Sequence, residues 1–192
     1  GDERMLFFLA DNTARSSINR SCLMYSLYDK VNGDWLTPIA VNDDGSMDAF
    51  PDVYVDGDNL YVAWSNAKQT YADNVEMTTV LAGLEICMAR YDAKTNSFID
   101  FETLTDNEVM DVLPKIAIID GVAAVIWHRN SDNDAFGTSG NNAVLCRVMS
   151  EENERSLGSQ LGNINGMDAG IMDGELTFAV IIDSHRNLET TD

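Results

Sequence analysis

The stretch MDAFPDVYVDGDNLYVAW, residues 47–64, occurs in two further versions along the chain. Residues 110–127 read MDVLPKIAIIDGVAAVIW, and residues 167–182 give a shortened version, MDAGIMDGELTFAVII. Each version begins with Met-Asp, continues into a segment rich in β-forming residues, passes an Asp-Gly pair and enters a second such segment. Asp-Gly between two alternating apolar segments is a strong hairpin signal. The repeat therefore predicts the same two-stranded hairpin three times along the chain.

Two more strand-like segments follow the first hairpin, at residues 84–91 and 98–104, with a polar turn between them. The second hairpin is followed in the same way, and residues 5–41 carry this order without its first strand. The unit is therefore four strands, and its copies are about 60 residues apart. Repeats of four antiparallel strands at such a period are typical of propeller blades, because one sheet cannot bury both of its faces alone.

We predict an all-β fold, a β-propeller-like arc of about three and a half four-stranded antiparallel blades. Residues 1–192 would form a single propeller segment, with blade pieces at residues 5–41, 47–104, 110–161 and 167–182. A helical turn is possible within residues 75–82, in the loop after the first hairpin. The alternative fold is a β-sandwich, which also uses many short strands. A sandwich does not predict the recurring Met-Asp and Asp-Gly positions, so we rank it second.

An arc of this size is short of a closed ring, since propellers have about four to eight blades. Its two ends would each expose an apolar sheet face, which soluble monomers avoid. We therefore expect either a homodimer, in which two arcs complete one ring, or the remainder of a longer propeller.

Composition limits the classes of partner. The chain has 32 Asp and Glu against 12 Lys and Arg, a formal net charge of −20. This argues against binding nucleic acid or an anionic membrane surface, both of which require clustered basic residues. No apolar run is long enough for membrane insertion. Cys22, Cys87 and Cys146 all fall in apolar strand-like segments with no metal-site spacing, which indicates small buried residues.

Residues 51–64 contain Pro-x-Val, Asp-Gly and Leu-Tyr-Val-Ala-Trp, and Ile-x-x-Ala-Arg-Tyr-Asp and Asn-x-Phe follow within residues 86–98. This pattern resembles the repeats of bacterial extracellular β-propellers. It is similar to the sialidase-like families with Asp-box-related turns, with Asp29, Gly33 and Trp35 as the fairest copy of such a turn. The resemblance covers nearly the whole chain and implies an extracellular or cell-surface protein of a bacterium.

Three aspartates, Asp48, Asp111 and Asp168, follow the Met that opens each repeat. If each starts an innermost strand, the three carboxylates lie around one end of the central channel, where they could bind Ca²⁺. The alternative, which we favour, is that each accepts hydrogen bonds from the backbone of the turn before its own strand. We expect no other cofactor.

A candidate ligand-binding group lies at the end of the hairpins. Trp64 and Trp127 close the second strand of their repeats, and His128 and Arg129 follow directly. Aromatic and polar side chains at the mouth of a loop could contact a glycan or a protein, and the loops at residues 65–83 and 129–141 are the best places for recognition. The alternative for both tryptophans is a position in the core between blades, since Trp is usually buried.

No catalytic residue can be assigned. A sialidase-like glycosidase needs several converging arginines, yet Arg90 and Arg147 fall at non-equivalent positions of their repeats. The chain also lacks the Gly-x-Ser-x-Gly and His-Glu-x-x-His motifs. We therefore predict a non-catalytic propeller scaffold or binding module of a secreted or cell-surface bacterial protein, which binds glycan or protein through loops on one face. The alternative is a fragment of a sialidase-like glycoside hydrolase. Of the two, we favour the binding protein over the enzyme.

Overall fold

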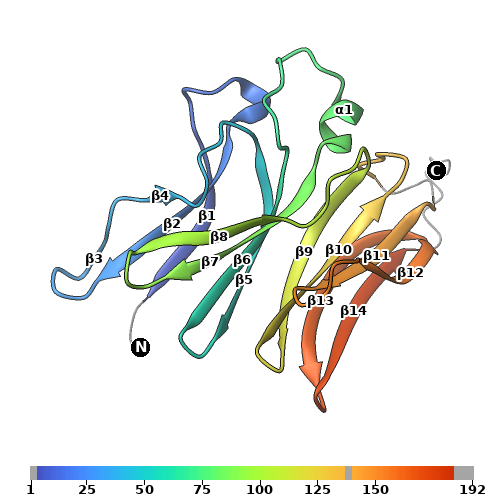
Figure 1. Ribbon diagram of the computed structural model, residues 1–192. Helices are drawn as coiled ribbons and strands as arrows, with labels where there is room; N and C mark the ends of the chain where they lie inside the picture. Colours follow the sequence, from blue (N-terminus) through green and yellow to red (C-terminus); the bar gives the residue numbers. More distant parts are fainter. Residues whose placement is uncertain (1–3, 137–139, 184–192) are drawn as a thin grey trace, which may run out of the picture.

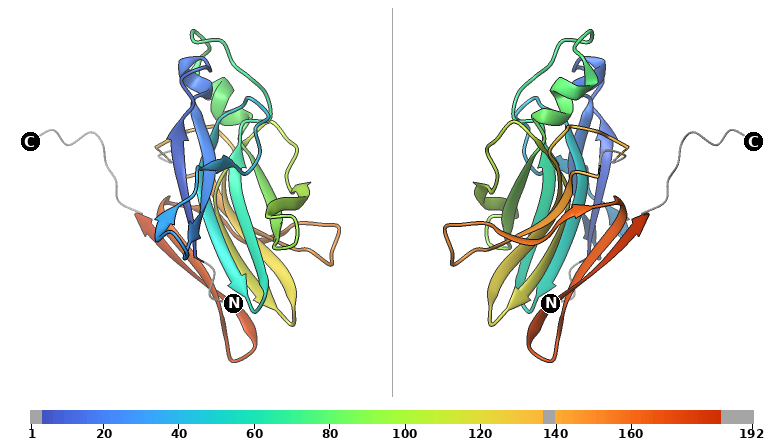
Figure 2. Two further views of the ribbon diagram at one scale, coloured as in Figure 1. Left: turned by 90° about the vertical axis from the view of Figure 1, so that its left-hand side faces the viewer. Right: turned by 90° about the vertical axis from the view of Figure 1, so that its right-hand side faces the viewer.

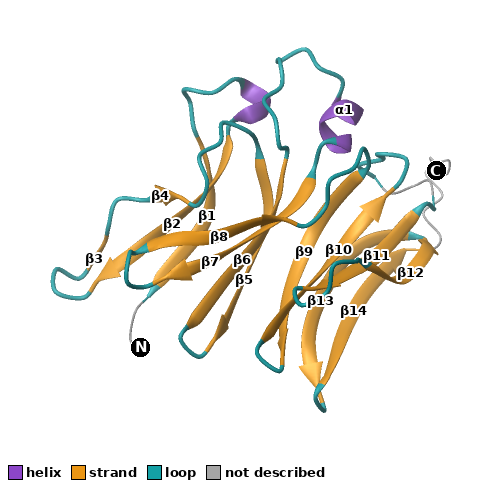
Figure 3. Cartoon of the chain, in the orientation of Figure 1, coloured by secondary structure: helices purple, strands orange, loops and turns teal. Residues whose placement is uncertain are grey.

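The computed structural model describes residues 4–136 and 140–183, and these residues form antiparallel sheets arranged side by side in an arc. Figure 1 shows the arc running from β1 and β2 at one end to β13 and β14 at the other. The strands make up most of the described chain, and the two short helices lie in loops along one edge of the arc (Figure 3). The predicted all-β, propeller-like arc is confirmed, and the β-sandwich alternative is wrong.

The first sheet lacks an inner strand. It consists of β1 (Met5–Asp11), β2 (Ser21–Asp29), β3 (Asp34–Trp35) and β4 (Ile39–Ala40), in which β3 and β4 both pair with β2. A 3-10 helix, η1 (Ser17–Asn19), lies between β1 and β2.

Two complete four-stranded sheets follow, each with its strands in chain order. The second sheet consists of β5 (Asp48–Asp56), β6 (Asn59–Asn66), β7 (Glu85–Asp92) and β8 (Ser97–Thr103), with α1 (Met77–Ala82) in the loop after β6. The third consists of β9 (Met110–Ile119), β10 (Val122–Asn130), β11 (Asn142–Val148) and β12 (Arg155–Leu161). The last sheet has two strands, β13 (Asn163–Met172) and β14 (Glu175–Asp183).

The first strands of the sheets contact one another. β9 packs against both β5 and β13, while β8 and β12 lie at the opposite edges of their sheets. β5, β9 and β13 are therefore the inner strands of the arc, as expected for the first strand of each propeller blade.

The Asp-Gly pairs form the predicted hairpin turns in two of the three repeats. Asp120 and Gly121 both have positive φ (50° and 76°), and so do Asp173 and Gly174 (54° and 82°). Two successive residues with positive φ define the turn that best matches strand twist. In the first repeat the turn lies one residue later, because the last strand pair before it already includes Asp56. Gly57, with φ of 58°, then takes the first turn position.

A bulge recurs near the start of each inner strand, and its position identifies equivalent residues in the three repeats. In β5 the pairing shifts between Ala49 and Asp52, and in β9 it shifts between Val112 and Lys115. Asp48 and Asp111 each lie directly before the last regular pair ahead of this bulge.

The third repeat is aligned differently from what its sequence suggests. In β13 the shift follows Ile164, so the residue equivalent to Asp48 and Asp111 is Asn163. Asp168 pairs with Ala179 in the middle of the strand, and it is exposed. The prediction that all three aspartates begin their inner strands is therefore wrong for Asp168, because the Met-Asp pair of the third repeat lies five residues further along its strand.

Both tryptophans of the repeat are buried between sheets. Trp64 is 1% exposed and packs with Leu23 and Tyr25 of the first sheet. Trp127 is 0% exposed and packs with Ile86 and other residues of the second sheet. The second and third sheets are thus apolar on both faces, and each is stabilised by a neighbour on both sides, which is the packing a propeller requires.

The three cysteines are buried and unpaired, in agreement with their positions in apolar strands. Burial raises the pKa of the Cys87 thiol to about 11, so this thiol is inert near neutral pH. Within residues 4–136 and 140–183, no helix has the length and apolar character needed to cross a membrane.

Replacing Trp127 by alanine should destabilise the protein by about 3–5 kcal/mol, because it leaves a cavity between two sheets. The matched control is Trp35→Ala, since Trp35 is 42% exposed and should lose no more than about 1 kcal/mol. Urea unfolding monitored by far-UV circular dichroism measures both. Equal effects of the two substitutions would contradict the assignment of Trp127 to the core.

Candidate functional site

The starts of the inner strands and the loops after β6 and β10 meet at one end of the arc, opposite the hairpin turns (Figure 1). We call this the loop end. It holds most of the buried polar side chains, including Asp48, Glu85, Asp111 and His128. Buried polar groups require partners, so their hydrogen bonds indicate which of them are free to act on a ligand.

Asp48 joins three strands of two sheets. Its Oδ2 accepts a hydrogen bond from the backbone N–H of Leu23 at 2.9 Å, and its Oδ1 accepts one from Nδ2 of Asn66 at 2.9 Å. The carboxylate is 1% exposed, and burial raises its pKa above the ordinary value. Trp64 lies on the same side of the sheet, but its Nε1 makes no hydrogen bond within the described residues. Asp48 therefore fastens the second sheet to the first.

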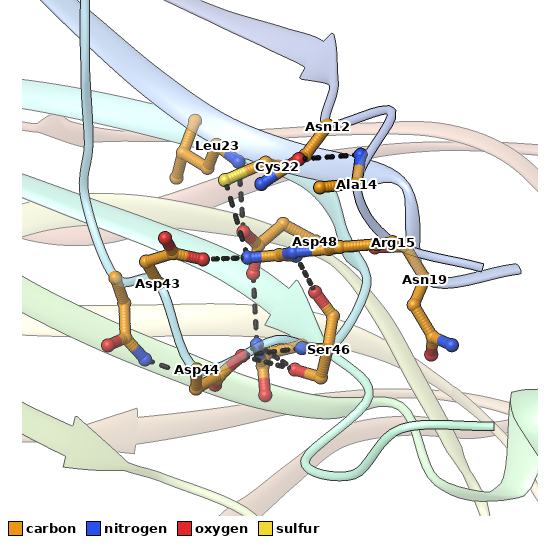
Figure 4. Close-up of polar contacts among 12 residues, drawn as sticks. Asn12, Ala14, Arg15, Asn19, Cys22, Leu23, Asp43, Asp44, Ser46 and Asp48 are labelled. Atoms are coloured by element: carbon orange, nitrogen blue, oxygen red, sulfur yellow. Dashed lines mark hydrogen bonds and ion pairs between the residues drawn. The ribbon is translucent and has the colours of Figure 1, made fainter. Parts of the chain in front are cut away.

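A polar network around Arg15 closes the loop before β5 (Figure 4). The Arg15 guanidinium donates to the carbonyl of Ser46 at 2.6 Å and forms an ion pair with Asp43. Asp44 accepts hydrogen bonds from the backbone N–H and the hydroxyl of Ser46, at 2.9 and 2.6 Å. These contacts satisfy the loop's own polar groups, so the network has a structural role.

Asp111 forms an ion pair with Arg129, which lies two residues after Trp127 on β10. Arg129 donates from Nε to Oδ1 at 2.7 Å and from a terminal nitrogen to Oδ2 at 2.8 Å. Trp127 Nε1 and Asn107 Nδ2 donate to the same carboxylate, each at 2.9 Å. Arg129 also pairs with Glu154 at 2.6 Å. With four donors around it, Asp111 has little capacity left for a ligand.

Glu85 is the least satisfied carboxyl of this end. Its Oε1 accepts the backbone N–H of Asn107 at 2.7 Å, while its Oε2 is buried and has no hydrogen-bond partner among the described residues. Burial raises its pKa above the ordinary value, with further upward contributions from Asp111 and Asp106. The side chain is 3% exposed, so Glu85 does not reach the surface.

His128 lies on β10 next to an open space. It is 4% exposed, and its Nε2 lies 2.9 Å from Oδ1 of Asn142. Burial lowers the pKa of this imidazole, which therefore stays neutral at neutral pH. Because the Asn142 oxygen can only accept, Nε2 donates to it, and Nδ1 of the neutral imidazole is left to accept a hydrogen bond, as from a hydroxyl group.

A cavity of about 240 Å³ adjoins His128, and we call it the axial cavity because the three inner strands line it. Its walls are mostly apolar, with His128 and Asn163 as polar exceptions. The lining residues are Phe50, Leu81, Met110, Val112, Leu113, His128, Ala135, Asn163 and Ile164. A mainly apolar hollow with a few placed polar groups is the usual form of a small-molecule site.

A second, more polar cavity of about 500 Å³ lies between α1 and the loops before β9 and after β10. Its lining includes hydroxyl and amide side chains, among them Tyr71, Asn107 and Asn133. A Cβ atom at Gly83 would lie 2.1 Å from Oη of Tyr71, so only glycine leaves room for this tyrosine. The Tyr71 hydroxyl accepts a hydrogen bond from Gln69 Nε2 at 2.9 Å, which holds the wall of the cavity in place.

The predicted site residues are therefore only partly brought together. His128 and Arg129 lie at the loop end as expected, but the indoles of Trp64 and Trp127 are buried and present no face to a ligand. Glu85, Phe50 and Asn163 are new members that the sequence did not single out. Asn163 was missed because the Met-Asp pair of the third repeat lies five residues further along its strand, and the positive φ of Phe50 has no signature in the sequence.

The metal prediction rests on a weaker basis than the sequence implied. Within residues 4–136 and 140–183, no three His, Cys, Asp or Glu side chains are grouped as an ion would require. Asp48 and Asp111 accept protein hydrogen bonds, and Asp168 accepts one from the backbone N–H of Ala169 at 2.9 Å. The expectation that each aspartate accepts backbone hydrogen bonds from the turn before its own strand is wrong. The backbone donor to Asp48 is Leu23 of the neighbouring sheet, the donors to Asp111 are side chains, and the backbone donor to Asp168 lies within its own strand.

Comparison with known proteins finds related folds and no related sequence. No protein-family model matches the chain, and no curated protein matches it. An α-L-arabinanase of Penicillium chrysogenum, solved with arabinobiose, is similar with a TM-score of 0.54 and 11% identity, over 91% of this chain and 52% of that one. An α-L-arabinofuranosidase of Fusarium graminearum, solved with an iminosugar inhibitor, has a TM-score of 0.59 and 8% identity, over 92% and 53%.

The same Fusarium graminearum enzyme solved with arabinobiose gives a TM-score of 0.54 at 9% identity. The chain thus spans about half the length of the solved structures it matches, and at this identity the likeness concerns the fold. The solved structures named above are an arabinanase and an arabinofuranosidase, both glycoside hydrolases. They overturn the prediction of a non-catalytic scaffold and favour its alternative, a fragment of a glycoside hydrolase, without supporting a sialidase-like assignment.

Replacing Arg129 by methionine should cost about 3–5 kcal/mol of stability, because it leaves the Asp111 charge buried without its main partner. Asp111 has an exposed fraction of 0% and Arg129 of 16% in their side chains. Arg90→Met is the matched control, since Arg90 and Asp100 form a more exposed pair, 34% and 61%, worth at most about 1 kcal/mol. Denaturant unfolding at pH 7 measures both, and similar losses would contradict this structural role of Arg129.

Acidification should destabilise the protein through His128. The folded state lowers the pKa of this imidazole, so the unfolded chain binds the proton more tightly, and stability falls as pH drops below about 6.5. Between pH 7.5 and 5.5, the wild type should lose about 1 kcal/mol more than His128→Gln. Urea titrations of both proteins at the two pH values measure this difference. Equal losses would show that His128 titrates alike in both states.

Proposed function

We propose that this chain forms about half of the propeller of a glycoside hydrolase and supplies one wall of its glycan site at the axial cavity. The observation that carries the proposal is the likeness of the fold, over 91–92% of the chain, to arabinan- and arabinoside-degrading enzymes. The position of the cavity supports it, because the cavity lies where the inner strands and the recognition loops converge.

The backbone beside the cavity supports a binding role. Phe50 and Leu113 have positive φ, 50° and 57°, at equivalent positions of the bulges in β5 and β9. A non-glycine residue in this conformation costs about 1–2 kcal/mol, and such strain is concentrated at functional sites. Phe50 is 46% exposed at the cavity, where its ring can cover the apolar face of a sugar.

The composition of the cavity favours a neutral sugar. Among the described residues that line it, none is charged, so the site offers no arginine for the carboxylate of an acidic sugar. His128 and Asn163 can exchange hydrogen bonds with hydroxyl groups. Arabinose-containing oligosaccharides are therefore the first ligands to test, because two of the structures with this fold were solved with arabinobiose.

Hydrolysis requires more than this chain provides at the cavity. Glycoside hydrolases use a pair of carboxyl groups on either side of the bond that is cleaved. The lining residues described here include no Asp or Glu, and Asp48 and Glu85 at the same end of the arc are buried. We infer that at least one catalytic carboxyl comes from further blades, whether of a longer chain or of a second copy. The predicted extracellular location is part of this proposal.

The experiment measures binding of arabinobiose by isothermal titration calorimetry and release of sugar from arabino-oligosaccharides by chromatography. The 192-residue chain should bind the ligand. Release of sugar by this chain would mean that a second copy supplies the missing carboxyl, and binding without release would mean that further blades of a longer chain supply it. Phe50→Ala should weaken binding about five- to tenfold, since one aromatic contact is worth about 1 kcal/mol.

Phe101→Ala is the matched control for Phe50→Ala. Phe101 is 48% exposed, nearly the same as Phe50, but lies on the outer strand β8 away from the cavity. Its substitution should leave the affinity unchanged. Equal losses from both substitutions, or no binding of any neutral oligosaccharide, would contradict the proposed site.

A further inference from the structure

We propose that the second cavity, between α1 and the loops before β9 and after β10, binds the next sugar of an oligosaccharide whose first sugar lies in the axial cavity. We call this second cavity the polar cavity. The inference rests on the proposed function, because it takes the axial cavity as a sugar site. It adds that the ligand is a neutral oligosaccharide of at least two units. Both views in Figure 2 show α1 at the loop end, opposite the hairpin turns of the inner strands.

The two cavities lie on either side of one wall. In α1, Leu81 lines the axial cavity and the next residue, Ala82, lines the polar cavity. In the loop after β10, Ala135 lines the axial cavity and Asn133 lines the polar cavity. Asn133 Oδ1 also accepts a hydrogen bond at 2.8 Å from the backbone N–H of Met110, which lines the axial cavity. Two hollows separated by single residues can hold adjacent units of one chain of sugars.

The size of the axial cavity supports a ligand that extends beyond it. Its volume of about 240 Å³ is below the roughly 300–1,000 Å³ of most small-molecule sites. The polar cavity adds about 500 Å³ on the other side of the wall. A ligand that fills both cavities therefore matches the usual size of such a site, whereas a ligand confined to the axial cavity does not.

The wall of the polar cavity is fixed by bonds to the first sheet's loop. The backbone of Tyr71 exchanges hydrogen bonds with the Asn19 side chain, at 2.9 and 2.7 Å, and Asn19 is 3% exposed. Asp73 accepts hydrogen bonds from the backbone N–H and the hydroxyl of Ser17, at 2.8 and 2.7 Å. Because these contacts order the loop after β6 before a ligand arrives, binding costs less conformational entropy.

The polar groups of this cavity divide into those bonded within the protein and those left for a ligand. The amides of Asn107 and Asn133 make hydrogen bonds within the protein. The side chains of Thr78, Thr79 and Glu108 make none within the described residues, and all three residues are exposed. A hydroxyl donates and accepts, and a carboxylate accepts, so this set complements the hydroxyl groups of a sugar.

Charge selects a neutral sugar over an acidic one. Among the described residues that line the polar cavity, Glu108 is the one charged side chain. Its carboxylate repels the carboxylate of an acidic sugar, while it can accept a charge-assisted hydrogen bond from a sugar hydroxyl. Since the axial cavity has no charged lining residue among those described, one neutral oligosaccharide suits both cavities.

Isothermal titration calorimetry with arabinose and arabinobiose tests the division of the ligand between the two cavities. The wild type should bind arabinobiose at least tenfold more tightly than arabinose, because the second sugar gains hydrogen bonds in the polar cavity. Glu108→Gln and Thr78→Val should each weaken binding of arabinobiose about fivefold and leave the affinity for arabinose unchanged. Phe50→Ala should weaken binding of both sugars, since Phe50 lines the axial cavity.

Glu152→Gln is the matched control for Glu108→Gln. Glu152 is also exposed, but it lies between β11 and β12, away from both cavities, so its substitution should leave both affinities unchanged. Equal affinities of the wild type for the two sugars would overturn the inference, and so would equal losses for both sugars from Glu108→Gln. Either result leaves the axial cavity as a sugar site. A wild type that binds neither sugar contradicts the proposed function itself, and the inference with it.

Discussion

The structure depends on the packing of one sheet against the next. The second and third sheets are apolar on both faces and each packs against a neighbour on both sides, and Trp64 and Trp127 are the largest side chains buried in this way. This constraint explains the repeat and the arc. It also keeps the indoles away from ligands, because a side chain that holds two sheets together is enclosed by both.

At the loop end, hydrogen bonds and ion pairs of buried carboxylates supplement this packing. Asp48 links the second sheet to Leu23 of the first, and Asp111 is fixed by Arg129. Hydrogen bonds within the protein occupy both carboxylates, so neither is available to a ligand. The groups left for a ligand in the axial cavity are therefore neutral, chiefly His128 and Asn163 beside the strained Phe50. A neutral, partly apolar wall suits a sugar and leaves the acid and base of hydrolysis to other blades.

Much of the fold could be predicted from sequence because its signals are local. Alternating apolar residues and Asp-Gly turns predict strands and hairpins, and their order along the chain is confirmed. The candidate site was predicted less well. His128 and Arg129 were found by their position after a strand, whereas Glu85 and Asn163 matter through neighbours far along the chain. Asp168 was misplaced because a repeated dipeptide does not reveal a shifted strand register.

The sequence by itself determined the order of the strands and hairpins, since side-chain period and turn chemistry act between residues close in the chain. Only the tertiary structure decided which faces are enclosed, which aspartates are bound by other sheets, and that Asn163 is the counterpart of Asp48 and Asp111. Those outcomes depend on bulges and on contacts between sheets. Such contacts join residues distant in sequence, so no local pattern records them.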